Sequence, residues 1–239
     1  MRRLLDFLAA PLVDYTTALE AVFPAFRLSI AAVIVVGFAV SWWIYVPIHE
    51  LLHAYGCILT GGEVTRLEIS PEYGAALLQK VFPFVVVGSD YAGQLTGFDT
   101  RGNDLIYLAT DFLPFVLTIV IGIPLLRSVA RDRERPLAAA IKLGVAMPIA
   151  YAPFISITGD YFEMGSVIVS RVTSWCVAGF DIERWRSDDL FKLAGELSNG
   201  DGTSFDAFGL TLSFLVGVIL IYATYAAGIA CSRRLWNHR

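Results

Sequence analysis

The sequence has few charged side chains for a chain of its length. Only 17% of its 239 residues are aspartate, glutamate, lysine or arginine, whereas 56% are hydrophobic. Soluble domains usually carry about a quarter charged residues, so this composition argues against a soluble fold. The net charge is −4 and no basic run is dense, so nucleic acid is not expected as a partner.

Cysteine and histidine are also scarce, with three residues of each. The cysteines are widely separated and form no C-x-x-C pair: Cys57, Cys176 and Cys231. This spacing indicates neither a zinc knuckle nor a framework of disulfide bonds.

Long apolar runs are abundant, and about 20 such residues suffice for a helix to cross a bilayer. They predict an all-α integral membrane protein with about four transmembrane helices, an N-terminal interfacial helix and a small membrane-adjacent β segment. We expect one membrane domain over residues 1–239 with these parts: interfacial helix 1–27, spans 28–59, 105–126, 137–158 and 207–230, and extramembrane segments 60–104 and 159–206.

Proline and glycine subdivide two of these parts. Pro47 removes a backbone donor, so we expect a kink or break there and a span of about 28–48. Residues 63–69 alternate as a strand does, and residues 81–87 predict a second strand that Pro83 confines to a sheet edge. The stretch 88–103 is expected to be a glycine-rich, polar loop.

The basic residues predict the orientation of the chain in the membrane. An even number of predicted spans separates each basic cluster from the next, so the clusters share one side, which should be cytoplasmic. The clusters are residues 1–3 with Arg27, 127–135 and 233–239. We therefore expect a multi-pass protein of a bacterial inner membrane with both termini cytoplasmic and with segments 60–104 and 159–206 on the opposite side.

Two of the three histidines stand in the pattern H-E-x-x-H at residues 49–53. On a helix, His49 and His53 project from one face and can share a metal ion, with Glu50 close enough to act on a metal-bound water. Ionisable groups inside an apolar run are costly and usually functional. The pattern predicts a catalytic Zn²⁺ site, with Glu50 as the general base that activates water for peptide hydrolysis.

A catalytic zinc ion takes three protein ligands, and the remaining histidine, His238, lies in the cytoplasmic tail. The third ligand is therefore expected to be a carboxylate. Asp160 is the first candidate because it follows a glycine at the end of a predicted span. Asp111, inside the second span, is the alternative, and Glu163 is third. Either aspartate also has a simpler role, as a helix cap or as a hydrogen-bonding partner of a neighbouring helix.

The residues around the motif resemble the site-2 protease family of intramembrane zinc metalloproteases. The resemblance consists of H-E-x-x-H at 49–53 on a membrane helix, a glycine pair with a β-like stretch at 61–87, and a later apolar segment that ends in Gly159-Asp160. Residues 108–114 are similar to the family's second-span signature. The resemblance implies cleavage of membrane-bound substrates, with Asp160 as the third zinc ligand.

The predicted function is thus a membrane-embedded zinc metalloprotease that acts on a membrane protein or a membrane-adjacent peptide. An extended substrate could pair with the edge-like segment 81–87. One alternative is a non-catalytic scaffold or accessory subunit, whose long outer segments would contact partners in a membrane complex. Another is a tetrapyrrole-binding protein with His49 or His53 as a haem ligand, although no C-x-x-C-H is present.

Overall fold

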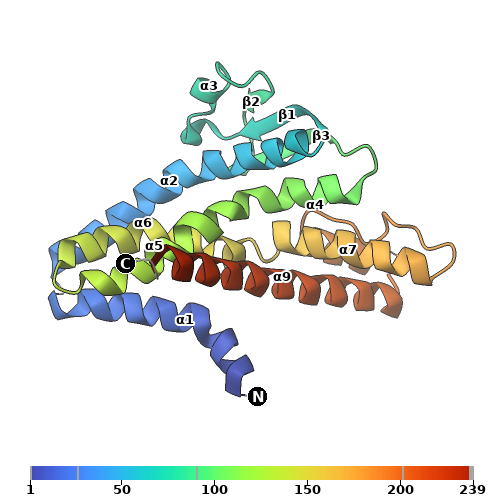
Figure 1. Cartoon of the computed structure of the whole chain (residues 1–239). Coiled ribbons are helices and arrows are strands. Elements are labelled where there is room, and N and C mark those ends of the chain that lie inside the picture. Colours follow the sequence, from blue (N-terminus) through green and yellow to red (C-terminus); the bar gives the residue numbers. More distant parts are fainter. Residues whose placement is uncertain (1, 26, 90, 201, 237–239) are drawn as a thin grey trace.

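The computed structural model describes residues 2–25, 27–89, 91–200 and 202–236 (Figure 1). Its helices are α1 (Arg2–Val22), α2 (Leu28–Leu59), α3 (Ala75–Leu78), α4 (Asp104–Phe112), α5 (Ile123–Ser128), α6 (Pro136–Ile155), α7 (Asp160–Cys176), α8 (Leu190–Asn199) and α9 (Ser204–Trp236). Its strands are β1 (Glu63–Ile69), β2 (Val85–Val87) and β3 (Gly93–Asp99). The chain is therefore mostly helical with one small sheet.

Four helical stretches are long and apolar enough to cross a membrane. They are Leu28–Leu59, Asp104–Asp132, Pro136–Cys176 and Ser204–Leu235. These stretches agree with the four predicted spans. The first has the predicted bounds, and each of the other three extends beyond its predicted bounds at both ends. Figure 1 shows them side by side, with the sheet lying on α2.

Helix α2 is continuous through Pro47, so the predicted break is wrong. A proline removes one helical hydrogen bond, but packing on a neighbouring helix can offset that loss. Here α2 packs along α6, and Ser41 Oγ donates a 2.8 Å hydrogen bond to the Val145 carbonyl across this contact. The residues of the H-E-x-x-H pattern consequently lie on an unbroken helix.

The second apolar stretch is the irregular one. After α4 it passes through a 3₁₀ turn at Leu113–Phe115 and a π-helical turn at Thr118–Gly122 before α5 begins. Pro114 stands in the 3₁₀ turn, where its missing N–H interrupts the α-helical ladder. Thr118 Oγ1 donates to the Ile149 carbonyl of α6 at 2.7 Å, which holds the widened turn against its neighbour.

The sheet has the strand order β2-β1-β3. β1 pairs in parallel with β2 and antiparallel with β3, and its position agrees with the strand predicted at 63–69. Within the segment predicted at 81–87 only Val85–Val87 is a strand, and it lies at a sheet edge.

The expectation of a loop over 88–103 is wrong, because β3 occupies much of it. The glycines there permit close strand contact: a Cβ at Gly97 would lie 2.6 Å from Thr65 Oγ1 of the paired strand.

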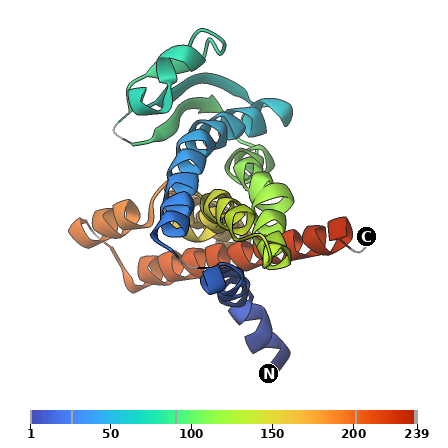
Figure 2. The ribbon, with the colours of Figure 1, turned by 90° about the vertical axis from the view of Figure 1, so that its left-hand side faces the viewer.

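The sheet covers the second half of α2. A small apolar core joins the two elements, with Ala54 of α2 packed among Leu67, Ile69 and Val85. Figure 2 shows the sheet beyond α2 on one side of the bundle, with α1 and α9 on the opposite side. The strand β3, which follows β1 back along α2, is thereby brought to the histidine pattern.

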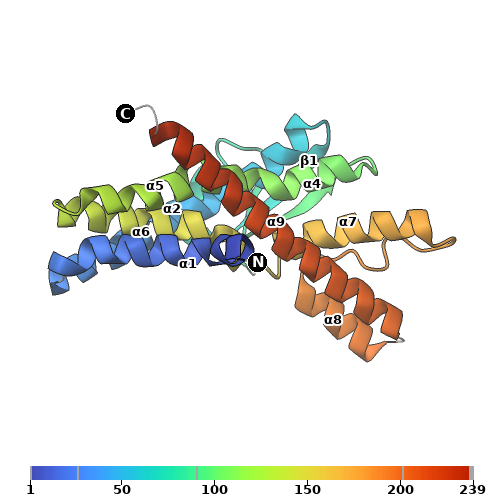
Figure 3. The same cartoon turned by 60° about the horizontal axis from the view of Figure 1, so that its bottom comes forward.

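Helix α1 runs alongside α5 and α6 in two views (Figures 1 and 3). Its attachment is apolar and polar: Ala18, Ala21 and Val22 are buried in the core, and Asp14 accepts two hydrogen bonds from Arg127 Nη1, at 2.6 and 2.7 Å, and one from the Tyr225 hydroxyl at 3.0 Å. This contact ties α1 to α5 and α9.

The segment after α6, which was predicted to be extramembrane, contains the helices α7 and α8. A short connection at residues 156–159 leads into α7, which packs on α9 and buries Tyr161, Phe162 and Met164. The end of α6 is close to the predicted end of that span. The connection between α6 and α7 lies beside the middle of α2, and this places Asp160 near the two histidines.

Candidate metal centre

His49 and His53 lie one turn apart on α2 and face the interior of the bundle. Their Nε2 atoms are 3.1 Å apart, and the two side chains are only 13% and 10% exposed. Two imidazole nitrogens at this separation present a pair of ligand atoms to one ion.

Asp160, the first residue of α7, completes a three-membered cluster. Its Oδ2 lies 3.4 Å from His49 Nε2, and its Oδ1 lies 3.7 Å from His53 Nε2. Ligand atoms of the three residues all lie within 4.8 Å of one another, so the cluster could hold a metal ion. The structure thus brings together the two histidines and the aspartate that the sequence ranked first.

Each ligand is oriented by a hydrogen bond. His53 Nδ1 lies 2.9 Å from the Thr110 carbonyl, which can only accept, so Nδ1 carries the proton and Nε2 of the neutral ring presents a lone pair. The Tyr45 hydroxyl lies 2.9 Å from His49 Nδ1, and Ser156 Oγ donates to Asp160 Oδ2 at 2.6 Å.

The three supporting residues were not predicted from the sequence. Tyr45 stands four residues before His49 on α2, so helical spacing offered a signal for it, whereas Ser156 lies in the turn before Asp160, where that spacing does not apply. Thr110 acts through its backbone carbonyl, for which its residue type gives no signal.

Gly56 explains how that carbonyl reaches His53. A Cβ at position 56 would lie 2.4 Å from the Ala109 carbonyl oxygen and 2.8 Å from Thr110 Cα. Only glycine permits α4 to approach α2 this closely. The backbone contact one turn beyond His53 therefore determines the position of the ring's hydrogen-bond acceptor.

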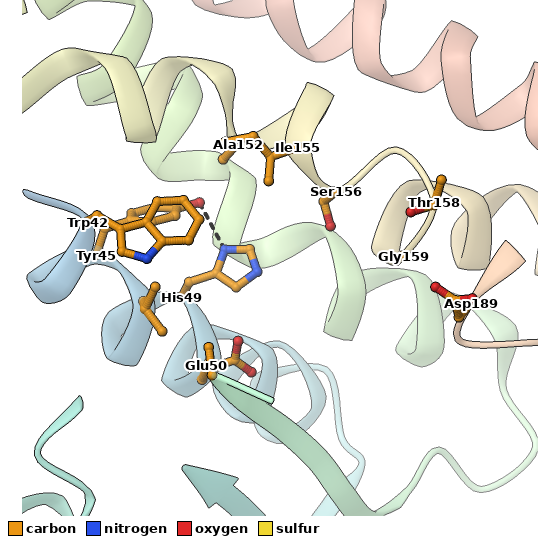
Figure 4. Close-up of a pocket in the computed structure, with 12 residues that line it drawn as sticks. Trp42, Tyr45, His49, Glu50, Ala152, Ile155, Ser156, Thr158, Gly159 and Asp189 are labelled. Atoms are coloured by element: carbon orange, nitrogen blue, oxygen red, sulfur yellow. Dashed lines mark hydrogen bonds between the residues drawn. The ribbon is translucent and has the colours of Figure 1, made fainter. Parts of the chain in front are cut away.

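The side chain of Glu50, a residue of α2, lies against the beginning of β3. A Cβ at Gly93 would meet its Cγ at 2.4 Å and its Cδ at 2.8 Å, so this strand passes directly over the Glu50 side chain. Glu50 and His49 both line a cavity of about 300 Å³ (Figure 4). Glu50 therefore borders the same space as the candidate ligand His49.

The two other acids considered as ligands lie apart from the cluster. Asp111 is 5% exposed, and its Oδ2 has no hydrogen-bond partner among the residues that the structure describes. Glu163 accepts a hydrogen bond from the Tyr107 hydroxyl. Neither belongs to the metal-ligand cluster found within the described ranges.

Comparisons with models of protein families, with curated proteins and with solved structures found no match to this chain. The resemblance of the motif to one family therefore stays a prediction from the sequence.

Proposed function

We propose that this protein is a membrane-embedded zinc metalloprotease, similar to site-2 proteases, that hydrolyses peptide bonds of a membrane-bound or membrane-adjacent substrate. The observation that carries the proposal is the cluster of His49, His53 and Asp160, whose ligand atoms lie close enough together to share one ion and of which His49 lines a cavity.

The size of the triangle fits zinc. Bonds of about 2.0–2.1 Å in a tetrahedral site place neighbouring ligand atoms about 3.3–3.4 Å apart. His49 Nε2 lies 3.1 Å from His53 Nε2 and 3.4 Å from Asp160 Oδ2, both close to that value, and the 3.7 Å approach of Asp160 to His53 Nε2 is made by its other oxygen, Oδ1. Two imidazoles and one carboxylate are also a frequent ligand set of catalytic zinc, which leaves the fourth position open for water.

A zinc ion in this site would lower the pKa of a water molecule in its fourth position toward about 7 and polarise a substrate carbonyl. Glu50 would act as the general base and acid, accepting a proton from the attacking water at its carboxylate and giving it to the leaving amine. The close contact with Gly93 limits where the Glu50 side chain can move, which keeps its carboxylate beside the cavity. Hydrogen bonds to Tyr45 and the Thr110 carbonyl hold both imidazole rings in place.

The substrate is proposed to bind as an extended strand along β3. The sequence had suggested the segment 81–87 for this role, but β2 is separated from β3 by β1. β3 occupies the other edge of the sheet, and its first residue, Gly93, contacts Glu50. Main-chain pairing with this edge would lead a peptide past the catalytic carboxylate.

The proposed orientation places the chain in a bacterial inner membrane with both termini in the cytoplasm. The α5–α6 turn, which holds the basic run 127–135, lies at the opposite end of the bundle from α8 in Figure 3. A thiol-reactive label that cannot cross the membrane should reach cysteine at Arg133 and at Gly200 from opposite sides, in a background without the native cysteines. Labelling of both from one side would contradict this orientation.

The experiment that tests the proposed function measures zinc and hydrolysis separately. Protein purified in detergent should contain one zinc per chain by mass spectrometry, and it should cleave members of a quenched apolar peptide library. Glu50→Gln should retain the zinc and lose cleavage, whereas His49→Ala should lose both. Absence of zinc from the wild type would refute the proposal, and zinc without Glu50-dependent cleavage would favour a non-catalytic scaffold.

A further inference from the structure

The cavity beside the metal centre has a wall that the proposed chemistry does not use. Its apolar lining comes from both sides of the site: Trp42, Tyr45 and Val46 of α2, Ala152 and Ile155 of α6, and Ala92 just before β3. His49 and Glu50 form part of the same lining (Figure 4).

We infer that this cavity is a substrate subsite that takes one bulky apolar side chain, of the size of leucine or phenylalanine, from a residue adjoining the scissile bond. The inference rests on the proposed function, because it assigns the cavity to the peptide that the metal centre cleaves.

The dimensions of the cavity suit such a side chain. An engineered protein cavity of about 150 Å³ binds benzene. The cavity here has about 300 Å³, enough for a phenyl or isobutyl group together with the backbone that carries it. Alanine at position 152 leaves this space open at the α6 side.

Four of the polar side chains on the wall already have partners. Trp42 Nε1 donates to the Tyr73 hydroxyl, Ser156 Oγ donates to Asp160, and Asp189 accepts from the backbone N–H groups of residues 191 and 192. The Tyr45 hydroxyl is bonded to His49. A polar substrate side chain would lose its water without gaining these groups as partners, whereas an apolar side chain loses nothing comparable.

The position of the cavity identifies which substrate residue enters it. Trp42, Tyr45 and His49 recur at intervals of three and four residues, so they lie along one face of α2. One helical turn rises about 5.4 Å, whereas an extended peptide advances about 3.3–3.6 Å per residue. A side chain in the cavity therefore belongs to a residue next to, or one removed from, the bond held at His49.

Binding of zinc-chelating probes tests this inference without requiring turnover. Three dipeptide hydroxamates that carry glycine, leucine or phenylalanine beside the chelating group would be titrated into the zinc-loaded Glu50→Gln protein in nanodiscs. Burial of the larger side chains should tighten Kd about 10- to 100-fold relative to the glycine probe. The readout is Kd by calorimetry.

Two substitutions and one matched control place the effect in this cavity. Ala152→Phe fills the space and should abolish the preference for leucine and phenylalanine while zinc remains bound. Ile155→Ala removes apolar wall and should reduce the preference about 5-fold. Ile141→Ala is the matched control, because it makes the same change about four turns away on the same face of α6, at a residue that is also exposed. It should leave all three Kd values unchanged.

The outcomes separate this inference from the proposed function. Equal Kd values for the three probes, or no binding by a protein that holds zinc, would overturn the inference and leave the metal centre intact. Equal Kd values are also the result expected if a lipid chain, and not a substrate side chain, occupies the cavity. Absence of zinc from the wild type would instead refute the function on which the inference depends.

Discussion

The two halves of the metal centre are assembled in different ways. His49 and His53 belong to one helix, so their relative position follows from local geometry alone. Asp160 comes from the junction of α6 and α7, and it reaches the histidines only because these helices pack against α2 and α4. The spacing of the first half therefore needs only an intact helix, with the His53 ring further held by the Thr110 carbonyl of α4, whereas the second half depends on the packing of several helices.

The largest expected effect comes from removing a member of either half. Loss of a supporting hydrogen bond alone typically weakens metal binding about 10- to 100-fold, so His53→Ala or Asp160→Ala should weaken zinc binding by more than about 100-fold. Competition with a chromophoric chelator measures this affinity. The His53 variant should keep the wild-type fold, because an alanine on α2 preserves the helix.

Asp111→Ala is the matched control for Asp160→Ala, because it also removes a carboxylate from the interior. Asp111 is buried and lies outside the ligand cluster, so its loss should leave zinc affinity close to the wild-type value. If Asp111→Ala released the metal and Asp160→Ala retained it, the third ligand would be wrongly assigned.

An effect of intermediate size is expected at Gly56, where α4 packs against the helix that carries the two histidines. Gly56→Ala places a methyl group against the α4 backbone, and overpacking of this kind costs about 1–3 kcal/mol in the free energy of unfolding. It should also weaken zinc binding, since displacement of α4 moves the Thr110 carbonyl away from His53 Nδ1. Thermal unfolding in detergent and zinc titration provide the two measurements.

Gly195→Ala is the control for this substitution. Gly195 lies within α8, and a Cβ there would meet nothing within 4 Å. Replacement of a glycine by alanine inside a helix should stabilise it by about 0.5–1 kcal/mol, with no change in zinc affinity. If Gly56→Ala behaved in the same way as Gly195→Ala, the close approach of α4 would not be needed at the site.

The same division explains how much of the site the sequence could predict. The histidine pair and Glu50 followed from spacing, because a helix fixes the angle between residues four apart. Asp160 followed less directly, from the chemistry of zinc and the lack of a third useful histidine. The Thr110 carbonyl and the role of Gly56 depend on contacts between α2 and α4, to which no local pattern corresponds.

The fold shows a similar limit. The apolar runs predicted four helical stretches, since hydrophobic length alone determines that feature. Pro47 suggested a break that packing on α6 prevents, and the glycines of 88–103 suggested a loop where they instead allow β3 to pair closely with β1. In both cases a local preference was overridden by a contact with a distant segment.

The smallest expected effect, and the one that sharpens the comparison most, concerns the two supporting hydroxyls. Ser156→Ala removes the hydrogen bond to Asp160, and Tyr45→Phe removes the one to His49. Because Asp160 stands at a helix junction while His49 is held by a continuous helix, Ser156→Ala should weaken zinc binding about 10-fold and Tyr45→Phe by less. A larger loss for Tyr45→Phe would show that His49 depends on its hydroxyl partner within α2 more than Asp160 depends on Ser156 at the helix junction.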